Sequence, residues 1–132
     1  MSNLTITNFD SEDGVRAVEA SEQGELTLAG ADTVARLTIL GRITATGKYG
    51  FYDSGAVDGT ETPVAVSLSE VDEIGAGDYP LSVLLKGKVR TDKLIIDGSA
   101  AGVGITDAIK DALRTFDIIV EDALETAALD NQ

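Results

Sequence analysis

The sequence predicts an α+β fold rich in β structure: a compact single domain of short strands, with one short C-terminal helix and a terminal strand. Three observations support this. The chain has 132 residues, which suffices for one hydrophobic core but not for two ordinary domains. It contains 14 Gly, 2 Pro and 5% aromatic residues, a composition typical of tight turns between short strands. Apolar and polar residues alternate through its middle, and a helical spacing of apolar residues follows near the C-terminus.

The charge and residue types exclude several classes of function. A net charge of -13 repels phosphate groups, so we expect no nucleic acid and no membrane among the partners. Because the sequence has no His and no Cys, it cannot form a Ser-His-Asp or Cys-His centre, a disulfide or an ordinary zinc site. We therefore expect no enzymatic activity and no cofactor. The sequence has neither a signal-peptide pattern nor an apolar run of membrane-spanning length, which favours a cytoplasm-like compartment.

Charge divides the chain unevenly. Residues 1–33 hold seven acidic residues and a single Arg. We therefore expect three segments, which are an acidic, partly flexible N-terminal arm (1–32), a β-rich core domain (33–122) and a C-terminal tail (123–132). Short strand-forming patches lie within the arm at Leu4–Thr7 and Val15–Ala20. Such an arm either gains order by adding a strand to a partner or contains an ordinary edge strand, and the sequence supports both equally.

The strongest strand pattern runs from Thr33 to Ala45, where apolar and polar positions alternate and Gly41 marks a bulge or a close backbone approach. Lys48–Tyr52 and Pro63–Leu68 are the next expected strands, joined by the turn-rich sequence DSGAVDGTE. Leu81–Val89 and Lys93–Ile96 are separated by the polar residues RTD, which predicts a hairpin.

Two interpretations fit the C-terminal third. Its apolar residues lie on one helical face, which is compatible with a single long helix. The β-branched sequence FDIIVED instead favours a strand from about Asp117 to Glu121. We prefer a helix that Thr106 caps, with Asp107 in its first turn, ending near Thr115 before this final strand. The residues of the apolar helical face are Ile105, Ala108, Ile109, Ala112, Leu113, Phe116, Val120 and Leu124.

Several groups could carry chemistry, and each has a simpler interpretation. Asp53, Asp58 and Glu61 could bind calcium, but they lack the alternating acidic positions of an EF-hand loop, and Asp58-Gly59 is typical of a tight turn. The glycines in residues 98–110 resemble a phosphate-binding approach to a helix, yet they match no nucleotide-binding pattern, so a flexible helix start is favoured. Acidic pairs such as Glu121-Asp122 suit a solvated face.

One basic cluster stands out in this acidic chain. Lys86, Lys88, Arg90 and Lys93 lie on the expected hairpin. They are either a contact for an acidic neighbour, including another copy of the chain, or charges that protect an exposed strand edge.

The segment from Leu40 to Leu68 contains a distinctive order of motifs: L-G-x-I at the end of a strand, T-G-K-Y, a Tyr-Asp-Ser turn, and A-x-D-G-x-x-T-P before the next strand. This segment resembles the core signature of phage head decoration proteins, the lambda D-like capsid cement family. The resemblance extends loosely to the C-terminus through DAIKDALRTF and DIIVED. Residues 1–32 match no motif of the family, and the tail after Asp122 is an extension.

The resemblance implies a β-tulip-like decoration protein fold in which the middle turn is architectural. The turn would form a corner that sets the register of two strands, with its Pro at the start of a strand, where no ladder N–H is needed. The implied corner residues are Tyr52, Asp53, Gly55, Asp58, Gly59, Thr62 and Pro63. No catalytic residue and no metal ligand is implied.

The resemblance also implies a late structural protein of a bacteriophage, made in the host cytoplasm and placed on the exterior of the viral capsid. Such a protein binds the major capsid protein of the expanded head as a homotrimer at threefold sites and stabilises the head against internal DNA pressure. Its arm orders on the shell, and the expected anchors here are Leu4, Ile6 and Phe9. The alternative function is a surface-displayed β-rich module that binds a host glycan or ions, although the low aromatic content argues against a glycan site.

Overall fold

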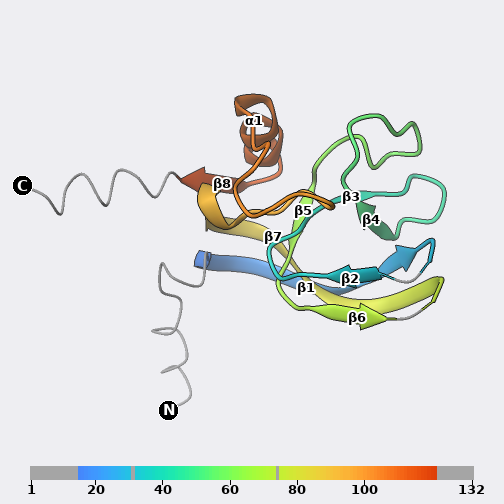
Figure 1. Ribbon diagram of the computed structural model, residues 1–132. Helices are drawn as coiled ribbons and strands as arrows, with labels where there is room; N and C mark the ends of the chain where they lie inside the picture. The colour runs from blue at the N-terminus through green and yellow to red at the C-terminus, as the bar shows by residue number, and fades with distance from the viewer. Residues whose placement is uncertain (1–14, 31, 74, 122–132) are drawn as a thin grey trace, which may run out of the picture.

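Two long antiparallel strands, β1 and β7, form the spine of the protein, and the shorter elements are arranged around them (Figure 1). The computed structural model describes residues 15–30, 32–73 and 75–121. The elements of this part are, in chain order, β1 (Val15–Leu28), β2 (Asp32–Val34), β3 (Ile39–Arg42), β4 (Tyr49–Phe51), β5 (Ala65–Ser67), β6 (Val71–Glu73), β7 (Gly77–Arg90), a 3-10 turn (Thr91–Lys93), α1 (Asp107–Thr115) and β8 (Ile118–Glu121).

The main sheet closes on itself. Its strand order is β1-β4-β3-β5-β7-β8, and β1 also pairs with β7, so the first five strands of this order form a small barrel. β5 and β8 pair one after the other with the same edge of β7, and β8 runs parallel to β7. β2 and β6 form a separate two-stranded ribbon. Val89 of β7 consequently has Val15 as its partner on one side and Val120 on the other. The start of β1 and the end of β8 therefore lie at one end of the barrel.

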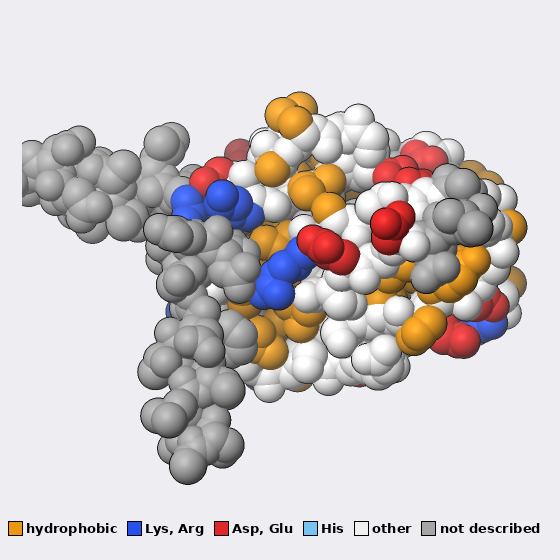
Figure 2. Space-filling model, turned by 60° about the horizontal axis from the view of Figure 1, so that its bottom comes forward, with side chains coloured by type: hydrophobic (Ala, Val, Ile, Leu, Met, Phe, Trp, Pro, Cys, Tyr) orange, Lys and Arg blue, Asp and Glu red, His pale blue; other side chains and the backbone are white. Residues whose placement is uncertain are grey.

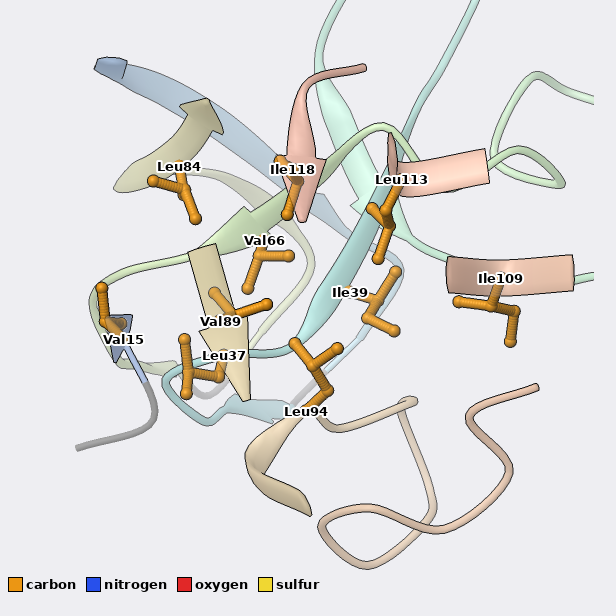
Figure 3. Packing of buried hydrophobic residues seen from close by; sticks show 10 residues of the cluster. All are labelled: Val15, Leu37, Ile39, Val66, Leu84, Val89, Leu94, Ile109, Leu113 and Ile118. Carbon is orange, nitrogen blue, oxygen red and sulfur yellow. The ribbon is translucent and has the colours of Figure 1, made fainter. Parts of the chain in front are cut away.

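Alternation along the strands creates two apolar clusters on opposite faces of the sheet. On β3, Ile39 joins one cluster and Leu40 joins the other. α1 and β8 cover the first cluster, which we call the helix-side core, and Figure 3 shows their side chains packed among those of β3, β5 and β7. The buried members of the helix-side core are Val15, Leu37, Ile39, Val66, Leu84, Val89, Leu94, Ile109, Leu113 and Ile118. Those of the second core are Leu26, Leu28, Val34, Leu40, Tyr49, Ala65, Val71, Leu81 and Val83.

The C-terminal helix and strand confirm the preferred interpretation of that region. The Thr106 hydroxyl accepts a hydrogen bond from the Ile109 N–H at 3.3 Å and so caps α1. After α1, Asp117 adopts a positive φ of 71°, which an α-helix does not allow, and this excludes a single long helix. Ile118 can then turn fully into the helix-side core as the first residue of β8.

The expected strand from Thr33 to Ala45 is wrong as a single element. Leu37 has φ 71°, which breaks the extended chain between β2 and β3. A branched side chain rarely adopts this conformation, and burial of the Leu37 side chain in the helix-side core offsets the strain. The close approach expected at Gly41 is confirmed, because a Cβ there would lie 2.5 Å from Thr60 Cα.

The expected hairpin between Leu81–Val89 and Lys93–Ile96 is also wrong. β7 is longer than expected, and both of its edges are occupied near its end, by β1 and by β8. The chain after the 3-10 turn crosses instead to the start of β3, where the Ile39 N–H donates to the Ile95 carbonyl at 2.9 Å. Leu94 is fully buried at this crossing. Burial of Leu94 thus directs the chain across the core rather than back along β7.

The expected boundary between arm and core at residue 32 does not hold for residues 15–28. These residues form β1, which pairs along its length with β7. Register shifts occur between Val15 and Ala17, between Val18 and Ala20, and at Ala20-Ser21, so bulges interrupt the pairing near the start of β1. Residues 1–14, with Leu4, Ile6 and Phe9, and the tail 123–132 lie outside the described residues. In the part of the chain that is described, no helix is long and apolar enough to cross a membrane.

Candidate functional site

The corner at residues 52–63 connects β4 to β5 and is tied both to itself and to the β3–β4 turn. The Asp53 N–H donates to the Thr60 carbonyl at 3.1 Å, which joins the two sides of the loop. The Thr44 N–H donates to the Asp58 carbonyl at 2.9 Å, which holds the loop to the end of β3. The corner is therefore hydrogen-bonded into the barrel rather than a loop without such contacts.

The acidic side chains of the corner bind the loop's own backbone. Asp53 Oδ1 accepts from the Gly55 N–H at 2.9 Å, and Glu61 Oε1 accepts from the Gly59 N–H at 2.8 Å. Asp58 Oδ1 accepts from both the hydroxyl (2.6 Å) and the N–H (3.0 Å) of Thr60, and these bonds hold the pKa of Asp58 below its usual range. The carboxylates brace turns, and no group of three acidic residues placed to hold a metal ion occurs in the described part of the chain.

Two glycines allow the corner to pack against β3. Gly59 has φ 111°, and a Cβ there would lie 2.3 Å from the Arg42 carbonyl oxygen. Gly41 of β3 faces the backbone of Thr60 in the same way. On the other side of the corner, the Val64 N–H donates to the Leu40 carbonyl at 2.9 Å. The corner thus packs closely against β3 between β4 and β5.

The remaining corner residues have different surroundings. Tyr52 packs against the helix-side core, and its N–H donates to the Ile39 carbonyl at 3.2 Å. The Thr62 N–H donates a long hydrogen bond of 3.5 Å to the Gly59 carbonyl. Pro63 is buried and lies just before β5. The tip of the corner carries Val57, which is 96% exposed.

A groove of about 870 Å³ lies between the corner, the end of β1 and the segment that leads into α1. Its walls include Asp53, Asp58 and Asp97, so it is acidic. Burial, and then the carboxylate of Asp32, raise the pKa of Asp97. An acidic groove disfavours phosphate groups, and the start of α1 is capped by Thr106. The glycine-rich approach to α1 is therefore a helix start rather than a phosphate site.

The structure brings together a polar cluster that the sequence did not reveal. The Tyr49 hydroxyl donates to Glu22 Oε2 at 2.8 Å and accepts from Arg42 Nη2 at 3.1 Å. The Arg42 guanidinium lies 5.0 Å from the centre of the Tyr49 ring, at cation–π distance. Burial and then the bond to Glu22 raise the pKa of Tyr49. Glu22 and Tyr49 are 27 residues apart, so no local pattern could have found this pair.

The basic cluster does not protect a strand edge. Lys86, Lys88 and Arg90 lie on β7, where β1 pairs on one side and β8 on the other. Arg90 forms a two-point ion pair with Asp92, at 2.7 and 3.0 Å. Figure 2 shows Lys and Arg side chains (blue) next to exposed hydrophobic side chains (orange) on the left of its view. A contact with an acidic neighbour remains the prediction for this cluster.

Comparison with known families supports the resemblance seen in the sequence. The family model described as Bacteriophage lambda head decoration protein D matches residues 16–118. This match covers most of the chain, from β1 to the first residue of β8, so the chain belongs to the lambda head decoration protein D family. It also shows that residues 16–32, for which no family motif was expected, are part of the family domain. No curated protein sequence matched the chain.

Family membership defines the general role of the chain. It is a phage head decoration protein, a structural protein that binds the capsid and belongs to the exterior of the virion. Its β-rich fold with one short helix agrees with this assignment.

Proposed function

We propose that this chain binds the outside of the expanded phage head as trimers at the threefold sites and stabilises the head against internal DNA pressure. Its partners are then the major capsid protein and two further copies of itself. A protein that binds the expanded shell but not its precursor stabilises the expanded form by its binding free energy. Because many copies bind one head, a modest interface per copy is sufficient.

The observation that best supports this proposal is the shared position of the start of β1 and the end of β8. Val15 and Val120 flank Val89 of β7, so the described chain begins and ends at the same end of the barrel. The corner lies toward the other end, because its groove is lined by Thr27 and Ala29 at the end of β1 (Figure 1). An arm at one end can reach along the shell while the rest of the barrel stays exposed.

The arm is the proposed attachment device. Residues 1–14 alternate apolar and polar residues at Leu4–Thr7, which suits addition of a strand to a loop of the shell. We propose Leu4, Ile6 and Phe9 as its apolar anchors. Ordering the arm on the shell costs conformational entropy, so these apolar anchors must supply much of the binding free energy.

Co-sedimentation with phage heads that lack this protein tests the proposal. We expect saturable binding to expanded heads, with three copies for each threefold site, and no binding to unexpanded heads. Expanded heads loaded with the protein should also resist heat and removal of external salt better than bare heads. Equal binding to both forms, or binding to neither, would refute the proposed function.

Deletion of residues 1–14 tests the arm separately. The deletion ends just before β1, so the domain should keep its thermal unfolding midpoint. Binding to expanded heads should be lost. A matched deletion of residues 123–132, which removes a segment of similar length beyond β8, should leave binding intact. If the 1–14 deletion variant binds expanded heads as tightly as the full chain, the arm is not the anchor. The proposal that the protein binds expanded heads would not be affected by this result.

A further inference from the structure

The outward face of β7 and β8 carries basic and apolar side chains side by side, of which Lys86, Phe116 and Ile119 are exposed and Lys88 is half-buried. Lys88 pairs with Ile119 across the parallel ladder between these strands. Their neighbours Val89 and Ile118 are buried in the helix-side core. Because side chains alternate along a strand, Lys88 and Ile119 point to the opposite face, away from α1.

Two of the four large hydrophobic side chains that are exposed among the described residues lie beside this ladder. Ile119 is 37% exposed and Phe116, just before β8, is 42% exposed. Phe116 also lines a shallow groove of about 370 Å³ with Leu85 and Val64, at the point along the edge of β7 where β5 starts and β8 begins. Glu22, Arg42 and Tyr49 complete the walls of this groove. The apolar surface thus continues from β8 onto β7 and the start of β5.

The basic side chains of this face are weakly engaged within the domain. Lys86 lies 3.9 Å from Glu19, and both side chains are 54% exposed, so solvent screens this pair strongly. The Lys88 side chain forms no ion pair or hydrogen bond with the described residues, whereas Arg90 is held by Asp92. In a chain of net charge -13, Lys86 and Lys88 form a positive patch that suits an acidic partner.

The position of the patch identifies the partner. Lys88 pairs with Ala17 near the start of β1, so the patch is continuous with the point where the arm leaves the domain. We infer that the outward β7–β8 face, built from Lys86, Lys88, Phe116 and Ile119, is a second contact with the shell and binds an acidic segment of the capsid protein that carries an apolar side chain. This inference rests on the proposed function, because it assumes that the arm end faces the shell.

The double charge reversal Lys86→Glu/Lys88→Glu tests the inference. Measured by co-sedimentation with expanded heads, the Kd should rise about tenfold or more, and its dependence on salt should become shallower. The matched control is Lys110→Glu on α1, because α1 lies on the side of β8 opposite to the outward face. This control should change the Kd by less than about twofold. An unchanged Kd for the double variant, while the unaltered chain binds, would overturn the inference but not the proposed function. Failure of the unaltered chain to bind would instead overturn both.

Two further measurements keep the test decisive. Ile119→Ser removes the apolar contact without reversing a charge, and it should also weaken head binding if the variants keep the normal thermal unfolding midpoint. Sedimentation velocity of the free protein examines the other possible occupant, a second copy of the chain. If the charge reversal changes self-association and leaves head binding unchanged, the face is a contact between copies and the inference is wrong.

Discussion

The ring of Tyr49 lies directly against the backbone of Gly24, where a Cβ would stand 2.7 Å from Tyr49 Cε2 and 3.0 Å from Cδ2. This contact joins β4 to β1 beside their register pair, Leu26 and Tyr49. The Tyr49 hydroxyl then reaches Glu22 two residues away. A glycine in the long strand therefore allows one aromatic ring to cover the seam at which the barrel closes.

Replacement of Gly24 by Ala should destabilise the protein. The added methyl group would push the Tyr49 ring outward, and overpacking of this kind costs about 1–3 kcal/mol. Gly30→Ala is the matched control, because a Cβ at Gly30 meets no atom within 4 Å. Urea unfolding followed by circular dichroism measures both variants. Equal midpoints for the two would mean that the ring moves without cost.

Gly41→Ala should destabilise more than Gly24→Ala. The atoms that a Cβ at Gly41 meets are the Cα, O and C of Thr60 at 2.5, 2.8 and 2.9 Å, and backbone cannot rotate away as a ring can. We expect a loss above about 3 kcal/mol in the free energy of unfolding. Within the same corner, Gly55→Ala serves as the control, since its nearest neighbour is Asp53 Oδ1 at 3.6 Å. A mild Gly41→Ala variant would argue against tight packing of the corner on β3.

The elements that could be predicted from the sequence are those with local signals. β4, β5, α1 and β8 follow from alternation, from turn residues and from the cap at Thr106, and each was expected within a few residues of its observed position. The close approach at Gly41 was expected for the same reason, because an isolated glycine in a strand pattern marks such sites.

The features that were missed depend on contacts between distant residues. The positive φ of Leu37 follows from burial of its side chain among residues of other elements, and the sequence around it alternates like an ordinary strand. β1 falls within the predicted arm because residues 1–33 are strongly acidic and the strand-forming pattern at Val15–Ala20 covers only its start, although β7 pairs with β1 from Val15 to Leu28. The Glu22–Tyr49–Arg42 cluster arises from barrel closure, which no local pattern indicates.

The cap of α1 should contribute measurable stability. Thr106→Ala removes the hydroxyl that accepts from the Ile109 N–H, and loss of a Thr cap costs about 1 kcal/mol. Thr115→Ala provides the control within the same helix, because the Thr115 hydroxyl donates back to the Asp111 carbonyl and is exposed. Its effect should stay within about 0.5 kcal/mol. Chemical denaturation that shows equal losses for both variants would contradict a capping role for Thr106.

Two Asp→Asn substitutions should change the free energy of unfolding, measured between pH 7 and pH 3, in opposite directions. Hydrogen bonds from Lys48 and Thr27 hold the pKa of Asp78 below its ordinary value of about 3.9. The unfolded chain therefore binds the proton first, so the Asp78 contribution to stability is complete above about pH 4 and is lost as the pH falls through the lower folded pKa. Asp97 has the reverse sign, because burial raises its pKa in the folded state.

At neutral pH the charged Asp97 consequently destabilises the fold, and this penalty decreases as the pH falls below its raised pKa in the folded state and is gone below its ordinary pKa in the unfolded chain. Asp78→Asn should lower the free energy of unfolding at pH 7 and flatten its fall below about pH 4. Asp97→Asn should raise the free energy of unfolding at pH 7 and have no effect near pH 3, where the carboxyl is protonated in both states. Urea titrations from pH 7 to pH 3 measure both variants. A loss of stability at pH 7 in Asp97→Asn would show that its carboxylate makes a favourable contact that outweighs its burial.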